Sequence, residues 1–226
     1  TERLSVIETI PLQENIFTTG SKDSMIKSFD KRQKMKPVQI FKGHKQEICG
    51  IKWSPYGKTL ASGSNDNKLI IWKIGYNKPF HIFNNAHSSA IRALDWSHQK
   101  YNFLGTGGGI QDRTIKVWNC TTMDEVNSID PETAICNLSL SKKDNEIVTT
   151  HGFTDNLVNI WKLEDEYKSM KLVESLKGHK NRVLYLATSP NLKTIATGSG
   201  DETIRLWNVF SSKKEIDINS KLNTDT

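Results

Sequence analysis

Short segments with alternating apolar and polar residues follow one another along almost the whole chain. A strand is predicted at "EICGIKWS", a turn at "PYG" and two further strands at "KTLASGS" and "KLIIWKI". An outer strand is predicted across the next loop, at "KPFHIF". The same order of parts recurs, so that we count five units with three inner strands each and no segment with a helical period. The pattern therefore predicts an all-β fold built from repeats.

Aspartates recur at a nearly fixed spacing in the turn before the third strand of each unit. The five are Asp23, Asp66, Asp112, Asp155 and Asp201, spaced 43, 46, 43 and 46 residues apart. An aromatic residue follows each aspartate by six residues, and in three units a histidine precedes that aromatic residue by 28 or 31 residues. A period of this size, with a histidine and a Trp-Asp-like ending, is typical of WD repeats, each of which forms one four-stranded propeller blade.

The repeats predict a WD-repeat β-propeller with five four-stranded blades. The expected bounds are 1–41, 42–83, 84–129, 130–176 and 177–210, followed by a flexible C-terminal tail over 211–226. The segment "KKEIDIN" in that tail is the candidate for the outer strand of the fifth blade.

Three of the units repeat a set of four polar and aromatic residues that is suited to a buried hydrogen-bond network. The members are His44, Ser62, Asp66 and Trp72 in the second unit, His87, Thr106, Asp112 and Trp118 in the third, and His179, Thr197, Asp201 and Trp207 in the fifth. We expect the aspartate to accept from the histidine ring, and the hydroxyl to link that ring to the indole N–H of the tryptophan. Left without partners, such buried polar groups would each cost about 1–3 kcal/mol.

The same residue types could form a hydrolase triad, but a catalytic site has no need to recur three times at fixed spacing. The glycine loop "GTGGGIQ" lies between two strands and lacks the helix of a dinucleotide site. No histidines stand at metal-ligand spacing. We therefore expect a non-catalytic protein without a cofactor or a metal.

Composition narrows the choice of compartment and partner. The 226 residues carry a net charge of +6, but the basic residues are scattered and do not alternate with aromatic residues, so we expect no nucleic-acid partner. No run of 18 apolar residues is present, so we expect no membrane partner. Three cysteines without a paired spacing favour a reducing compartment, and we expect the nucleus and the cytoplasm.

Five segments of the sequence are more specific than a generic WD repeat requires. They are "CGIKWS", "SGSNDN", "TGGGIQDR", "THG" and the run "GHKNRVLYLATSPNLKTIATGSGDETIRLW". Together and in this order they resemble the fizzy and fizzy-related family, the WD-repeat coactivators of the anaphase-promoting complex (cyclosome). The resemblance runs from about Leu4 to Phe210. It implies a seven-bladed propeller that brings substrates and pseudosubstrate inhibitors to this ubiquitin ligase by binding short degrons.

The resemblance also implies roles for four residues. Asn65 and Asn67 match family amides that hold the KEN degron on the top face, and Arg182 matches the arginine that faces the acidic residue of that degron. Glu202 matches the acidic residue that pairs with the arginine of the D box. Judged without the resemblance, the two asparagines are also favoured simply as turn residues.

This sequence departs from the family pattern at Ile110 and Ala134, where the family often has Thr and Gln. We expect weaker binding of an ordinary KEN box, and a divergent coactivator such as the meiosis-specific fungal branch. The five units resemble the third to seventh family blades, so we expect an open arc of poor solubility. The first two blades, the ligase-docking C box and the terminal Ile-Arg lie outside the resemblance. The alternative function is a general WD scaffold of an RNA-processing or chromatin complex.

Overall fold

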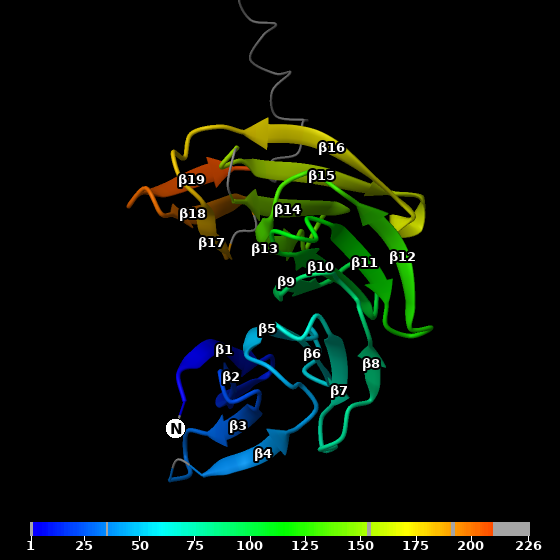
Figure 1. Ribbon diagram of the computed structural model, residues 1–226, viewed down its shortest axis with the longest axis vertical. Coiled ribbons are helices and arrows are strands. Elements are labelled where there is room, and N and C mark those ends of the chain that lie inside the picture. The colour runs from blue at the N-terminus through cyan, green and yellow to red at the C-terminus, as the bar shows by residue number, and fades with distance from the viewer. Residues whose placement is uncertain (1, 35, 153–154, 191–192, 210–226) are drawn as a thin grey trace, which may run out of the picture.

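The chain folds into five antiparallel sheets that follow one another in sequence, as Figure 1 shows for the computed structural model. The structure describes residues 2–34, 36–152, 155–190 and 193–209. The first sheet contains β1 (Leu4–Ile10), β2 (Gln13–Ser21), β3 (Ile26–Asp30) and β4 (Pro37–Phe41), and the second contains β5 (Ile48–Trp53), β6 (Thr59–Ser64), β7 (Leu69–Lys73) and β8 (His81–Phe83). The third contains β9 (Ile91–Trp96), β10 (Phe103–Gly108), β11 (Ile115–Asn119) and β12 (Asp124–Ile129).

The fourth sheet contains β13 (Ile135–Leu140), β14 (Glu146–His151), β15 (Val158–Glu164) and β16 (Ser169–Leu176), and the fifth contains β17 (Val183–Thr188), β18 (Thr194–Ser199) and β19 (Ile204–Asn208). Within each sheet the strands pair in chain order. Within the described ranges the fifth sheet thus has three strands. The predicted fourth strand, at "KKEIDIN", lies outside the described residues, as does the predicted tail over 211–226.

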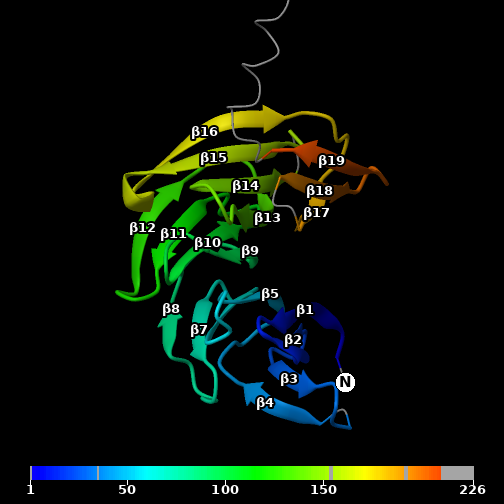
Figure 2. The same ribbon diagram turned by 180° about the vertical axis from the view of Figure 1, so that it is seen from behind.

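The sheets are arranged as the blades of a propeller around an open arc. Figures 1 and 2 show β1, β5, β9, β13 and β17 on the inside of the arc, and β4, β8, β12 and β16 along its outer rim. The prediction of an all-β propeller with five blades is therefore confirmed. One short helical segment, η1 (Asp165–Tyr167), was not predicted. No helix in the described part of the chain is long and apolar enough to cross a membrane.

The hydrophobic core is divided into layers between neighbouring blades. Trp53 and Trp72 are buried between the first and second blades, and Trp96 and Trp118 between the second and third. Further layers join the third blade to the fourth and the fourth to the fifth. The apolar residues of each blade are therefore buried against the neighbouring blades rather than around a single centre.

The repeated glycines in β6 and β10 allow this close approach. A Cβ atom added to Gly63 would lie 2.4 Å from the carbonyl oxygen of Ile91, in the next blade. One added to Gly107 would lie 2.4 Å from a methyl group of Ile135. A side chain at either position would therefore push neighbouring blades apart.

The two blades at the ends of the arc each have an uncovered apolar face. On the fifth blade Tyr185, Ile204 and Leu206 are 65%, 79% and 74% exposed. On the first blade Leu4 and Ile7 are 63% and 62% exposed. Apolar side chains exposed to this degree on a propeller blade are what a neighbouring blade would cover.

A polar cavity of about 500 Å³ lies along the inner strands and contains charged groups that the sequence pattern did not single out. Lys52 pairs with Glu8 at 3.0 Å. The carboxylate of Asp95 accepts hydrogen bonds from the backbone N–H of Leu140 at 2.9 Å and from the hydroxyl of Ser139 at 3.3 Å. Burial raises the pKa of Asp95, and the nearby Lys52 ammonium opposes that rise.

Candidate functional site

In the second blade a complete hydrogen-bond network joins the loop before β5, the strands β6 and β7 and the turn between those two strands. His44 Nδ1 lies 3.1 Å from both carboxylate oxygens of Asp66, and its Nε2 lies 2.8 Å from Ser62 Oγ. The indole of Trp72 donates to the same Oγ at 2.8 Å. With the neutral ring protonated at Nδ1, the serine hydroxyl donates to Nε2 while it accepts from the indole, so every group is satisfied.

The third and fifth blades place their corresponding residues in the same geometry. In the third blade the distances are 2.6 Å for His87 to Asp112, 2.7 Å for His87 to Thr106 and 2.8 Å for Trp118 to Thr106. In the fifth blade they are 3.1 Å for His179 to Asp201, 2.8 Å for His179 to Thr197 and 2.7 Å for Trp207 to Thr197. The structure thus brings all twelve residues of the sequence-derived sets together, four to a blade.

The aspartates of these networks are held in their charged form. Burial raises the pKa of Asp66, but hydrogen bonds from His44 and from the backbone N–H groups of Lys45 and Lys68 outweigh it and lower the pKa to about 2. The same balance, with hydrogen bonds from His87 and Thr114, lowers the pKa of Asp112. The charged carboxylate is therefore a fixed acceptor that ties the loop before each inner strand to the turn.

The fourth blade builds its network differently, and the sequence analysis missed it. His151, at the end of β14, takes the place of the histidine that the other blades supply from the loop before the first strand. Its Nε2 lies 2.8 Å from Thr149 Oγ1, its Nδ1 lies 2.6 Å from Thr133 Oγ1, and Trp161 donates to Thr149 at 2.8 Å. The signal in the sequence was the histidine of "THG", which lies two residues after Thr149, the threonine that pairs with the tryptophan.

The burial of the network determines its chemistry. Ser62 is 0% exposed, and its oxygen already accepts the Trp72 indole N–H while it bonds the His44 ring. A substrate carbonyl has no path to this oxygen, so the serine cannot act as a nucleophile. The sets of a hydroxyl residue, a histidine and an aspartate therefore act as structural clamps of the blades.

These clamps fix the turns that form one end of the propeller, which we call the top face; the opposite end is the bottom face. In the described turns, the residue that follows the aspartate adopts a positive φ: 63° at Ser24, 63° at Asn67, 61° at Arg113, 51° at Asn156 and 64° at Glu202. Asparagine tolerates this conformation better than most residues. The geometry of the turn is therefore sufficient to explain an asparagine at position 67. It does not explain a glutamate at position 202.

Asn65 is exposed on the top face, and its backbone N–H donates a hydrogen bond to the Glu47 carbonyl at 3.0 Å, which fixes the backbone there. Its side-chain oxygen accepts a hydrogen bond from the thiol of Cys49 at 3.0 Å. Burial raises the pKa of Cys49 to about 11, so this thiol remains protonated and donates at neutral pH. The amide NH₂ of Asn65 is thereby oriented in the exposed turn.

Arg182 is exposed at the same end of the molecule, immediately before β17. Its positive charge acts on the thiol of Cys136, as does the charge of Arg92, which also acts on Cys49. A row of neighbouring residues therefore runs along the inner part of the top face, in the order Asn65, Cys49, Arg92, Cys136 and Arg182. Asn65 and Arg182 share this face.

Arg92 and its neighbours carry none of the repeated marks from which the candidate residues were predicted. Arg92 is exposed and lines a hollow of about 360 Å³ together with Arg3, Ser5, Glu47 and Cys49. Arg3 pairs with Glu47 at 2.7 Å, whereas no carboxylate in the described part of the chain lies within ion-pair distance of Arg92. Arg92 occupies the second position of β9, as Cys49 does in β5, so aligning the inner strands would have singled it out.

Glu202 occupies a different place. It lies in the turn before β19 and borders a shallow hollow of about 530 Å³ on the uncovered face of the fifth blade, next to Tyr185 and Ile204. Of the two positions that depart from the family pattern, Ile110 is 64% exposed in the turn between β10 and β11. Ala134 is half-buried, and its carbonyl accepts from the N–H of Gly152 at 3.1 Å.

The fold and its top face define a WD-repeat propeller that offers exposed amide and arginine groups on one end. A sequence profile described as the CDC20/Fizzy WD40 domain matches residues 1–207. The chain belongs to this family, and the resemblance seen in the sequence is confirmed.

Individual relatives agree with the assignment. The chain is 46% identical over 199 residues to "Protein FIZZY-RELATED 3" of Arabidopsis thaliana, covering 88% of this chain and 40% of that protein. It is 42% identical over 211 residues to "Cell division cycle 20.1, cofactor of APC complex" of the same plant, covering 91% of this chain and 45% of that protein. The chain thus spans less than half the length of these relatives.

A solved structure shares the fold. A chain of the "Crystal Structure of Mitotic Checkpoint Complex" superimposes with a TM-score of 0.83 at 33% sequence identity, over 87% of this chain and 61% of that chain. The blades of this chain therefore share their geometry with a chain of this solved complex.

Proposed function

We propose that this chain is the substrate-recognition part of a coactivator of the anaphase-promoting complex, acting as a non-catalytic adaptor that binds degrons. Family membership supports the coactivator role, and the name of one Arabidopsis relative includes "cofactor of APC complex". Its partners are then subunits of this ligase, degron-bearing substrates and pseudosubstrate inhibitors. The proposed locations are the nucleus and the cytoplasm.

The observation that carries the proposal is the grouping of Asn65, Arg92 and Arg182 on the top face. An exposed amide can donate to and accept from the polar groups of an extended peptide. Two exposed guanidinium groups on the same face favour a peptide that carries a carboxylate. A degron with an amide and an acidic residue close together, as in the KEN box, has this chemistry.

The departures at Ile110 and Ala134 modify the proposal. An exposed isoleucine offers no hydrogen bond where a threonine would, and each lost hydrogen bond to a ligand is worth about 1 kcal/mol. We therefore expect this chain to bind an ordinary KEN peptide weakly and to prefer a different degron. The assignment to a meiosis-specific fungal branch remains part of this proposal.

The D-box half of the proposal rests on Glu202. Its carboxylate borders the apolar hollow on the fifth blade, so an arginine and a neighbouring leucine of a peptide have a charged and an apolar contact side by side. The family assignment disfavours the alternative of a general scaffold in an RNA-processing or chromatin complex.

Fluorescence anisotropy with labelled KEN-box and D-box peptides tests the proposal on the purified protein. The informative variant is Asn65→Ala combined with Arg182→Ala, because neither residue has a positive φ and both are exposed. Asn67→Ala, in contrast, would strain the turn and confuse the result. We expect the double variant to weaken degron binding by about tenfold or more, since each lost contact is worth about 1 kcal/mol or more.

The matched control is Arg32→Ala combined with Asn145→Ala, which removes the same two side-chain types from the bottom face. Equal loss of binding in both double variants would contradict a site on the top face. Tight binding of an ordinary KEN peptide by the unchanged protein would contradict the proposed shift in preference, while leaving the coactivator role intact.

A further inference from the structure

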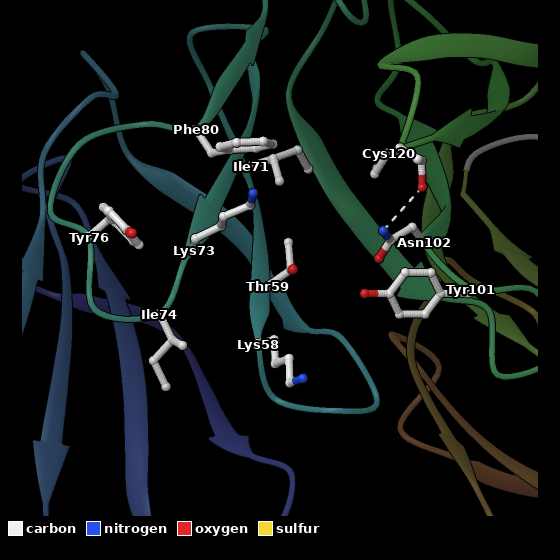
Figure 3. A pocket seen from close by; sticks show the side chains of 11 residues that line it. Lys58, Thr59, Ile71, Lys73, Ile74, Tyr76, Phe80, Tyr101, Asn102 and Cys120 are labelled. Carbon is white, nitrogen blue, oxygen red and sulfur yellow. Dashed lines mark hydrogen bonds between the residues drawn. The ribbon is translucent and has the colours of Figure 1, made fainter.

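A further concave surface lies on the bottom face, at the junction of the second and third blades, at the opposite end of the propeller from the top-face residues. Figure 3 shows its two walls, with Lys73, Ile74 and Phe80 from the second blade on one side and Tyr101 and Cys120 from the third blade on the other. The hollow has a volume of about 470 Å³ and adjoins a smaller one of about 350 Å³. We call the two together the bottom groove.

The short outer strand of the second blade creates this groove. β8 has three residues, and its pairing with β7 ends at Ile71 opposite His81. The chain between the two strands instead makes a detour over residues 74–80. In the third blade the outer strand pairs as far as Asn119 opposite Asp124, at the end of β11. The end of β7 is therefore flanked by a loop rather than by a strand.

The groove has an apolar floor and exposed aromatic edges. Ile71 is buried at its base, while Tyr76, Phe80 and Tyr101 are 67%, 49% and 65% exposed around it. Aromatic residues exposed together beside an apolar hollow are typical of surfaces that bind another protein. The hollow is also large enough for one or two side chains of a ligand.

The charge around the groove has one sign. Lys58, Lys73 and Lys78 line it, and none of its lining residues is acidic. Within the part of the chain that the structure describes, none of these three ammonium groups lies within ion-pair distance of a carboxylate. Unpaired lysines around an apolar hollow complement a ligand that combines carboxylates with an apolar side chain.

The aromatic rings also distinguish a peptide from a nucleic acid. Single-stranded nucleic acids bind by stacking their bases on exposed ring faces. Here Lys73 Nζ lies 3.5 Å from the centre of the Phe80 ring and covers that face. The floor is formed by aliphatic side chains and a thiol rather than by flat rings. An apolar side chain fits this shape better than a base.

We propose that the bottom groove docks an acidic linear segment of a partner protein, separate from any degron bound on the top face. An apolar side chain of that segment fills the hollow between Phe80 and Tyr101. Carboxylates on either side of it pair with Lys58 and Lys73.

Selection of phage-displayed random dodecapeptides on the purified protein tests this proposal. We expect enriched peptides to combine acidic residues with an aromatic or aliphatic one. Their binding should weaken by about tenfold or more in Lys58→Glu combined with Lys73→Glu, since reversing two rim charges turns attraction into repulsion. Lys168→Glu, an exposed lysine of the fourth blade, is the matched control and should leave binding unchanged.

A second variant, Tyr101→Ser, tests the apolar contact without changing charge, and thermal unfolding shows that each variant is folded. Variants of Asn65 and Arg182 should bind the selected peptides normally, which separates this surface from the degron site. The proposal is overturned if no peptide depends on the two lysines, or if the selected peptides are not acidic. It is equally overturned if labelled oligothymidylate, rather than peptide, loses its binding in the double lysine variant.

Discussion

Acidification should destabilise this propeller through His151, the histidine that closes the network of the fourth blade. The residue is 0% exposed, and both ring nitrogens face threonine hydroxyl groups rather than a carboxylate. Burial lowers its pKa from 6.5 to about 4. Between these two values the unfolded chain binds a proton at this residue and the folded chain does not, so the free energy of unfolding falls as the pH falls.

The size of the effect follows from the two pKa values. One pKa unit is worth about 1.4 kcal/mol, so the interval from 6.5 to about 4 corresponds to about 3 kcal/mol lost on acidification through this window. This is a large share of the stability of an ordinary domain, which is about 5–15 kcal/mol.

Urea unfolding at a series of pH values from about 7 to about 4, monitored by tryptophan fluorescence, measures this loss. The comparison is with His151→Gln, which retains an amide near Thr149 but cannot take up a proton. The variant should be less stable than the unchanged protein near pH 7 and should lose less stability on acidification. Parallel pH profiles for the two proteins would refute the reasoning, since other titrating groups are common to both.

Three further outcomes follow from the structure. Ser62→Ala should lower the free energy of unfolding, measured in urea, by about 2–4 kcal/mol, because it leaves the buried indole of Trp72 and a nitrogen of His44 without a partner. Ser62→Thr introduces the residue type found in the other networks and should retain most of this stability. Gly63→Ala should cost about 2 kcal/mol or more in the same assay, because its Cβ would meet the Ile91 carbonyl. Cys120 is 5% exposed at the edge of the bottom groove, and burial raises its pKa to about 12, so its thiol should react with a thiol reagent about tenfold or more slowly than a free cysteine; labelling of the folded protein as fast as that of free cysteine would contradict this.

The period of the aspartates and tryptophans was sufficient to predict the five blades and the members of three networks. These features repeat, so each unit supports the interpretation of the others. The fourth network was missed because His151 lies in the strand instead of the preceding loop, which breaks the spacing while preserving the contact with Thr149. A hydrogen-bond network requires an imidazole at a point in space, and two positions in the sequence can supply it.

Other features depend on contacts between blades, which no single repeat encodes. Arg92 became a candidate only when the inner strands were placed side by side. The burial of Asp95 depends on residues from the next blade, so its isolated carboxylate gave no signal. The bottom groove arises because β8 is shorter than the predicted outer strand "KPFHIF", which leaves Phe80 in the same loop as Tyr76. The proposed degron-binding residues came from the family resemblance. Without it, Asn67 would be classed as a turn residue, and its positive φ agrees with that role.

The division of the core into layers between neighbouring blades has a consequence for how the molecule comes apart. Each blade is stabilised by the one before and the one after it, so the structure behaves as a short row of coupled units. The end units have one neighbour in the described arc, the three inner units have two, and the third lies farthest from either end. Amide hydrogen exchange should therefore be graded by position, fastest in β1 and β19 and slowest in β9, β10 and β11. The local stability of the top face should therefore vary from unit to unit. Asn65 belongs to an inner unit, whereas Arg182 and Glu202 belong to a terminal unit.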